Sequence, residues 1–139
     1  MRKYYIFFLQ EEVYRDYFYK TSLLNQFFQA YLFNPNRKDL QQQFRYITRE
    51  TPTDWVRSLK EKRMLNQQYL TETNEYSIEE ISVQERWIEI SCESLAMVSF
   101  FFFHWLEQID QNCFVIEQDG HRHGWLSPLK KTYRLQMVR

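Results

Sequence analysis

The sequence predicts an α/β fold in which a small mixed β-sheet of about four strands is sandwiched between α-helices. Two kinds of pattern support this prediction: short apolar or alternating segments typical of strands, and longer segments whose apolar residues recur at helical spacing. The predicted order is strand, several helices, two strands, a helix and a last strand. The length of 139 residues suits one domain, so we expect residues 1–139 to form a single folded unit.

The first strand is predicted at residues 4–9, a continuous apolar run rich in residues that favour β-structure. A strand without polar alternation is covered on both faces, so this one should lie inside the sheet. The period then changes, because Val13 and Tyr17 lie four residues apart. That spacing predicts a short helix over residues 11–19.

Two further helices are predicted before residue 50. Ser22 is a suitable N-cap for a helix that ends near Leu32. One side of this helix should carry its apolar residues, which are Leu23, Leu24, Phe27, Phe28 and Tyr31. Pro35 fits the first turn of the next helix, which should run to about Thr48. The apolar line of that helix is Leu40, Phe44 and Ile47.

A fourth helix and a β-hairpin are predicted in the middle of the chain. Thr51 can cap a helix that continues to about Leu65, because Pro52 fits its first turn. Beyond a polar stretch the apolar period falls to two, and residues 87–92 alternate as in a strand with one buried face. Residues 76–83 are the expected hairpin partner of that strand.

The last part of the chain is predicted to contain a buried helix and a strand. Ser94 can cap a helix to about Ile109, and this segment is apolar on nearly all sides, as in a helix buried between layers. Residues 113–117 form the last predicted strand. The Asp-Gly pair at 119–120 is expected to make a turn, and residues 124–131 an extended tail.

The composition excludes some classes of protein and indicates a binding surface. The 18 basic and 18 acidic residues argue against non-specific binding to nucleic acid or membranes. Twelve Phe, ten Tyr and four Trp indicate that some rings are exposed to a protein partner, with an unusually aromatic core as the alternative. Cys92 and Cys113 are expected as free buried thiols. Without a signal peptide or a spanning segment, we expect a cytoplasmic protein.

The sequence carries no recognisable catalytic or metal-binding motif. His121 and His123, together with Asp119, are candidate metal ligands, but a solvated turn explains them better. Cys113 could pair with His104 as nucleophile and base, yet both residues lie in apolar segments and are expected in the core. We therefore predict no catalytic residue, no bound metal and no cofactor.

Two polar-aromatic patches are candidates for a binding surface. The first patch consists of Val13, Tyr14, Tyr17 and Phe18. The second patch consists of Gln43, Tyr46 and Ile47. Spacings of three to four residues place the members of each patch on one helical face, and such compositions are typical of interface centres. The alternative is that Ile47 and Phe18 point into the core and only one residue of each patch is exposed.

Short motifs along the chain resemble the family of sporulation inhibitors of replication, SirA, of Bacillus-like bacteria. The motifs are Tyr4-Tyr5-x-x-x-Leu9-x-Glu11-Glu12, Tyr17-Phe18, Gln43-x-x-Tyr46-Ile47-Thr48 and Gly124-Trp125-Leu126-Ser127-Pro128. They occur in the order typical of the family across nearly the whole chain. The segment from about residue 53 to 85 shows no such match.

This resemblance implies a small α/β protein without catalysis. SirA-like proteins bind the N-terminal domain of the replication initiator DnaA and suppress initiation when a cell commits to sporulation. The residues that correspond to the family's DnaA contacts are Val13, Tyr17, Gln43, Tyr46 and Ile47. The family pattern has an aromatic residue in place of Val13, so the contact there should differ. Pro128 belongs to the tail motif, where it either shapes the interface or orders the C-terminus, and the second role is favoured.

Two other classes of function are compatible with the residues. Exposed aromatic rings could stack on the bases of single-stranded nucleic acid, although the lack of a basic excess argues against this. A small enzyme could act through Cys113 or through His121 and His123, which a thiol-reactivity test and a metal assay would reveal. We predict a protein partner, DnaA, with no direct nucleic-acid or membrane partner.

Overall fold

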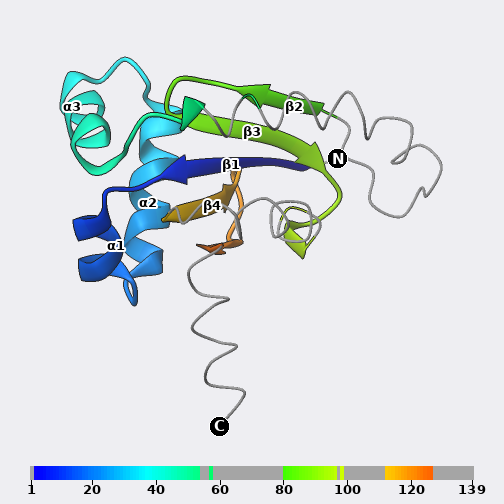
Figure 1. The fold of residues 1–139 in the computed structure, drawn as a ribbon, viewed down its shortest axis with the longest axis horizontal. Coiled ribbons are helices and arrows are strands. Elements are labelled where there is room, and N and C mark those ends of the chain that lie inside the picture. Colours follow the sequence, from blue (N-terminus) through cyan, green and yellow to red (C-terminus); the bar gives the residue numbers. More distant parts are fainter. Residues whose placement is uncertain (1, 54–56, 58–79, 97, 99–111, 127–139) are drawn as a thin grey trace, which may run out of the picture.

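The computed structural model describes residues 2–53, 57, 80–96, 98 and 112–126, in which a five-stranded sheet is combined with three helices (Figure 1). The elements are, in chain order, β1 (Arg2–Phe8), α1 (Glu11–Tyr17), α2 (Thr21–Phe33), α3 (Lys38–Ile47), β2 (Glu80–Val83), β3 (Trp87–Cys92), β4 (Cys113–Glu117) and β5 (His123–Trp125). The strand order is β2-β3-β1-β4-β5, which places the N-terminal strand at the centre of the sheet.

The predicted α/β fold is confirmed, with two corrections to the sheet. The described strands number five rather than about four, because His123–Trp125 pairs with β4 as β5. The sequence analysis placed this segment in an extended tail, since three residues that include a glycine show no period. The sheet is also not mixed, because all four pairings are antiparallel. β3 and β4 flank β1 on opposite sides, so they run parallel to each other without being neighbours.

Alternate residues of β1 contribute to two apolar clusters, one on each side of the sheet. Tyr4, Ile6 and Phe8 belong to the first cluster, whereas Tyr5 and Phe7 belong to the second. All five side chains are buried, which confirms that this strand is covered on both faces. β3 instead alternates between buried and half-buried residues, as predicted for a strand with one buried face.

Helices α1, α2 and α3 cover one face of the sheet (Figure 1). Phe28 of α2 stacks on Phe7 of β1 with ring centroids 4.1 Å apart. Tyr31 of α2 stacks on Phe44 of α3 at the same distance. Such ring pairs each contribute about 0.5–1.5 kcal/mol beyond the burial of their area. A large part of the aromatic surplus therefore stabilises the contact between the helices and the sheet.

The other face of the sheet is covered by residues that follow β3 and β5. Leu95, Val98 and Leu126 pack against the first apolar cluster. Leu95 and Val98 have helical backbone, in agreement with the start of the helix predicted over residues 94–109. The rest of that helix, His104 included, lies outside the described residues. So do Pro128 and nearly all of the helix predicted after Thr51.

The helix boundaries correct two predicted starts. α2 begins at Thr21, and its first turn accepts hydrogen bonds at the carbonyl oxygen of Lys20, so Ser22 is not the N-cap. α3 begins at Lys38 rather than near Pro35, because the chain first makes a turn there. None of the helices in the described part of the chain is long and apolar enough to cross a membrane.

Candidate protein-binding surface

The two patches singled out in the sequence lie at adjoining helix ends. The backbone amide of Gln10, just before α1, donates to the carbonyl oxygen of Ile47, the last residue of α3, at 3.0 Å. Gln10 Nε2 also donates to the carbonyl oxygen of Thr48 at 3.0 Å, and Leu9 forms an antiparallel bridge with Thr48. The residues after β1 therefore hold α1 and α3 together at the same end of the sheet (Figure 1).

Thr48 and Arg49 reinforce this junction. Thr48 is fully buried, and its Oγ1 donates to the carbonyl oxygen of Phe44 at 2.6 Å. Arg49 donates its backbone N–H to the carbonyl oxygen of Phe8 at 2.6 Å and its Nε to that of Leu9 at 3.1 Å. Because backbone oxygens accept these hydrogen bonds, the placement of the two helices does not depend on their exposed side chains.

Three of the five predicted contact residues are open to solvent at this end of the molecule. Tyr46 is 75% exposed and Tyr17 is 39% exposed, and Gln43 is also exposed. We call Tyr17, Gln43 and Tyr46 the α1–α3 surface. A tyrosine held in water on a fixed helix offers a large ring and a hydroxyl to a partner at a small cost in side-chain entropy, which is typical of interface centres.

The other two predicted contact residues, Val13 and Ile47, are buried. Each is only 8% exposed and belongs to the apolar cluster on the helix-covered face of the sheet. Ile47 lies three residues after Phe44 and continues its buried line, which the sequence analysis had also predicted. Val13 and Ile47 thus form the packed base of the helices that carry the α1–α3 surface. Their contact with a partner stays a prediction.

The tail motif stabilises α1 through Trp125. The indole Nε1 of Trp125 donates to the carbonyl oxygen of Phe18, just beyond α1, at 2.9 Å. The ring also meets Tyr14 edge-to-face, with centroids 4.8 Å apart. The sequence analysis assigned no role to this residue, although a buried indole requires an acceptor for its N–H. Trp125 therefore fixes the helix end next to Tyr17.

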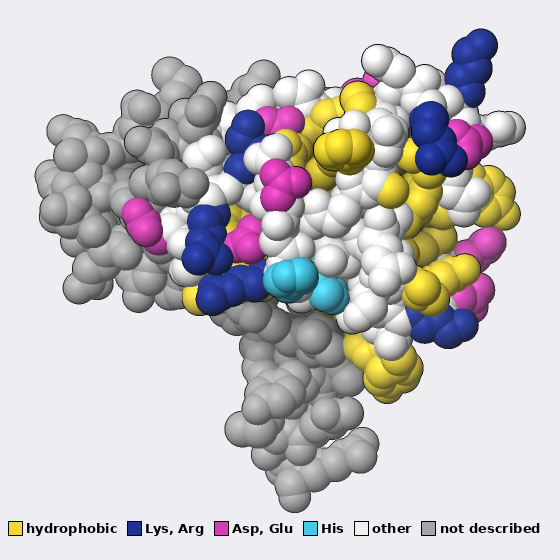
Figure 2. All heavy atoms as spheres, turned by 180° about the vertical axis from the view of Figure 1, so that it is seen from behind, with side chains coloured by type: hydrophobic (Ala, Val, Ile, Leu, Met, Phe, Trp, Pro, Cys, Tyr) yellow, Lys and Arg dark blue, Asp and Glu magenta, His cyan; other side chains and the backbone are white. Residues whose placement is uncertain are grey.

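Apolar side chains are also exposed on and beside α2. Figure 2 shows hydrophobic side chains concentrated over the part of the molecule that carries the helices. Tyr19 and Phe33, which the sequence analysis missed, are 92% and 83% exposed. Leu23 was predicted on the buried side of α2 and is more than half exposed, so that prediction was wrong. Leu24 and Phe28 define the buried side, and adjacent helical residues differ in direction by about 100°.

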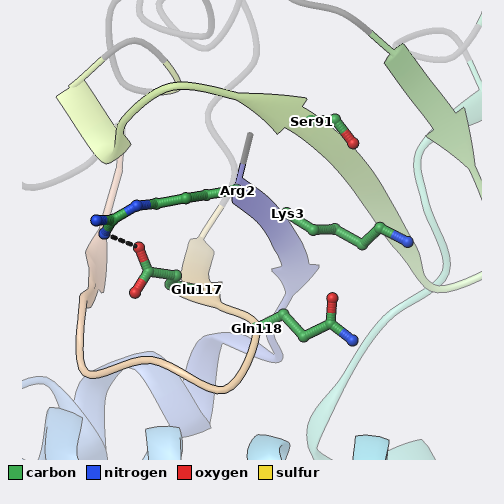
Figure 3. A pocket seen from close by; sticks show the side chains of 5 residues that line it. All are labelled: Arg2, Lys3, Ser91, Glu117 and Gln118. Atoms are coloured by element: carbon green, nitrogen blue, oxygen red, sulfur yellow. Dashed lines mark hydrogen bonds and ion pairs between the residues drawn. The ribbon is translucent and has the colours of Figure 1, made fainter.

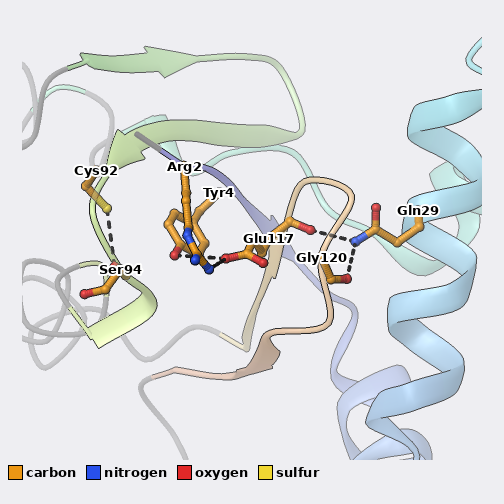
Figure 4. Close-up of polar contacts among 7 residues, drawn as sticks. All are labelled: Arg2, Tyr4, Gln29, Cys92, Ser94, Glu117 and Gly120. Carbon is orange, nitrogen blue, oxygen red and sulfur yellow. Dashed lines mark hydrogen bonds and ion pairs between the residues drawn. The ribbon is translucent and has the colours of Figure 1, made fainter.

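A polar cluster lies at the opposite end of β1 (Figure 4). Arg2 Nη1 donates to Glu117 Oε2 at 2.8 Å, and the hydroxyl of Tyr4 donates to the same oxygen at 3.3 Å. The hydrogen bond from Arg2 lowers the pKa of Glu117, and burial raises the pKa of Tyr4 to about 12. At neutral pH the carboxylate is charged and the phenol is neutral, so neither group is poised for proton transfer.

This cluster borders a hollow of about 450 Å³ (Figure 3). Arg2 and Glu117 point toward each other, whereas the side chain of Lys3 extends away from the pair. Lys3 instead approaches Glu89, with Nζ 4.0 Å from Oε2. Because these charged groups are already paired with one another, the hollow is a poor candidate for an active site.

The turn between β4 and β5 is fixed against α2 by Gln29 (Figure 4). Gln29 Nε2 donates to the carbonyl oxygen of Glu117 at 2.7 Å. The predicted Asp-Gly turn is confirmed, with Asp119 at a φ of 56°. A Cβ atom on Gly120 would lie 1.8 Å from Glu117 Oε1, so a larger residue there would displace the carboxylate from its place in the polar cluster.

The histidine pair and the thiols show no arrangement typical of a reactive site. His123 Nδ1 lies 2.7 Å from the carbonyl oxygen of His121. Within the described ranges, no three His, Cys, Asp or Glu side chains come together as metal ligands. Cys113 is fully buried, and burial raises the pKa of its thiol, as it does for Cys92. A nucleophilic cysteine requires the opposite shift, toward the thiolate.

Comparison with protein families supplies a match over most of the chain. The family model described as "Sporulation inhibitor of replication protein SirA" matches residues 2–130. A search of curated proteins finds no match. The matched range includes the N-terminal strand, all three described helices and the tail motif, and it confirms the resemblance drawn from the short motifs.

Proposed function

Since this chain belongs to the SirA family, the sporulation inhibitors of replication, we propose that it acts by binding the N-terminal domain of the replication initiator DnaA through the α1–α3 surface. Family membership makes the protein a regulatory inhibitor of replication in sporulation. The identity of its partner and the residues that contact this partner are our proposal.

The exposure of Tyr46 is the observation that carries the proposal. Its ring is 75% exposed although the next residue, Ile47, belongs to the core. The helix therefore does not need Tyr46 for packing. Tyrosines with this exposure on a rigid element are among the residues that most often dominate the free energy of protein binding.

The surroundings of Tyr17 also support a protein interface. Charged residues are exposed around it on α1, namely Glu11, Glu12, Arg15 and Asp16. The ammonium group of Lys20 lies 5.5 Å from the centroid of the Tyr17 ring. An aromatic centre with a polar, solvent-accessible rim is the usual composition of a protein-binding surface.

The test is a titration of the isolated N-terminal domain of DnaA with the full chain and with Tyr46→Ala. Removal of an interface-centre tyrosine commonly costs about 2 kcal/mol of binding free energy, roughly thirtyfold in affinity. An exposed substitution changes the free energy of unfolding by only about 0.5 kcal/mol. We therefore expect weaker binding at an unchanged melting temperature.

Phe33→Ala is the matched control for this experiment. Phe33 is 83% exposed on the last turn of α2 and lies outside the α1–α3 surface. We expect Phe33→Ala to bind the DnaA domain as the unaltered chain does. Normal binding by Tyr46→Ala would contradict the proposed surface, and no binding by the unaltered chain would contradict the proposed partner.

A further inference from the structure

A second cavity lies between the helices and the β2–β3 hairpin, on the flank of α3 away from Gln43 and Tyr46. Its volume is about 360 Å³, which falls within the range of about 300–1,000 Å³ found for small-molecule sites. Its lining includes Arg45 of α3, Tyr31 of α2, and Arg86 with Trp87 from the hairpin. None of these residues takes part in the α1–α3 surface.

Arg86 is held in place without a counter-charge. Its Nη1 donates to the carbonyl oxygen of Thr48 at 3.1 Å and lies 3.3 Å from Thr48 Oγ1. Its Nε is buried and has no hydrogen-bond partner in the described structure. No carboxylate of the described residues forms an ion pair with Arg86. A partly buried, unneutralised guanidinium destabilises a protein, and such groups often mark the place of an absent ion or ligand.

A second arginine and a firm aromatic wall complete the cavity. Burial raises the pKa of Tyr31, whereas the charges of Arg45 and Arg86 both act to lower it, so both guanidinium groups lie near one hydroxyl. The ring of Phe44 stacks on Tyr31 at 4.1 Å and meets Trp87 edge-to-face at 6.0 Å. The aromatic side chains are therefore packed against one another beside two positive charges.

The charge of the cavity favours an anion. Among the described residues that line it, Glu85 is the only acid, and this residue is exposed. The guanidinium group presents planar pairs of N–H donors that fit the oxygens of a phosphate or carboxylate, and two arginines match the charge of a phosphate monoester.

We propose that this cavity binds a small phosphate monoester, with the phosphate group between Arg45 and Arg86 and the apolar part of the ligand against Trp87. The site is independent of the proposed binding of DnaA, so each proposal can fail without the other.

The experiment titrates the full chain with phenyl phosphate and with inorganic phosphate at constant ionic strength. NMR follows the Arg86 Nε–H and the Trp87 indole N–H. We expect saturable shifts of both signals with phenyl phosphate, and weaker binding of inorganic phosphate, which lacks a ring for Trp87. Equal affinity for the two ligands would overturn the place assigned to the apolar part, and shifts that never saturate would overturn the whole site.

Three variants locate the binding in the molecule. Arg86→Lys keeps the charge but loses the planar donors, and Arg45→Gln removes one charge, so each should weaken binding at least tenfold. Arg15→Gln removes an exposed arginine from α1 and should leave binding unchanged. A melting curve for each variant separates loss of binding from loss of folding. Equal weakening by all three variants would show non-specific attraction and overturn the proposal.

Discussion

The two ends of β1 use polar and aromatic side chains in opposite ways. At its start, Arg2 and Tyr4 bond to Glu117, so the polar groups are satisfied within the molecule. At its far end, backbone hydrogen bonds hold α1 against α3, and Tyr17 and Tyr46 are left in contact with water. The difference teaches that the clustered charges of this protein stabilise its fold, whereas its capacity to bind lies in rings that the fold does not use.

The largest effect on this comparison is expected from Ile47→Ala. Ile47 belongs to the buried cluster, and truncation of a core isoleucine to alanine usually costs about 2–5 kcal/mol of stability. Ile47→Val, the matched control, should cost only about 0.5–1.5 kcal/mol. Chemical denaturation measures both values. A stability loss near zero for Ile47→Ala would show that Ile47 belongs to the binding surface rather than to its base.

A double-variant cycle with Tyr17→Ala and Tyr46→Ala sharpens the description of the far end. If both tyrosines touch one partner surface, their effects on the binding free energy should be coupled by about 0.5 kcal/mol or more. Titrations of the DnaA N-terminal domain with the single and double variants give the coupling. Strictly additive losses would indicate two independent contacts.

Trp125→Phe tests whether the tail motif supports the far end of β1 from within. The change keeps an aromatic ring but removes the donor to the carbonyl oxygen of Phe18. Loss of one such hydrogen bond usually costs about 0.5–1.5 kcal/mol. We expect a destabilisation of this size in chemical denaturation. An unchanged free energy of unfolding would show that the ring contacts alone hold the end of α1.

Glu117→Gln tests the start of β1, where the expected effect depends on pH. Because Arg2 lowers the pKa of folded Glu117, the carboxylate stabilises the fold fully above its unfolded pKa of about 4.3. This stabilisation is lost as the pH falls through the lower folded pKa. The stability difference between the unaltered chain and Glu117→Gln should therefore shrink in acid. A difference independent of pH, or one equal to that of exposed Glu93→Gln, would contradict a stabilising ion pair.

Local sequence patterns were enough to locate most elements, and the binding residues in part. The alternation at residues 87–92 and the apolar run at 113–117 predicted β3 and β4 with the bounds that the structure shows. The spacing of Phe44 and Ile47 likewise predicted the buried line of α3. These features depend on which face of one element is apolar, and a sequence shows this directly.

Only the tertiary structure decided what depends on contacts between distant segments. β5 exists because residues 123–125 pair with β4, and its own three residues contain no pattern that requires a strand. Whether Val13 faces the core or a partner depends on how α1 packs on the sheet, which the hydrogen bonds from Gln10 to the end of α3 determine. The sequence by itself determined the apolar faces and the family, whereas long-range pairing decided which rings remained in water.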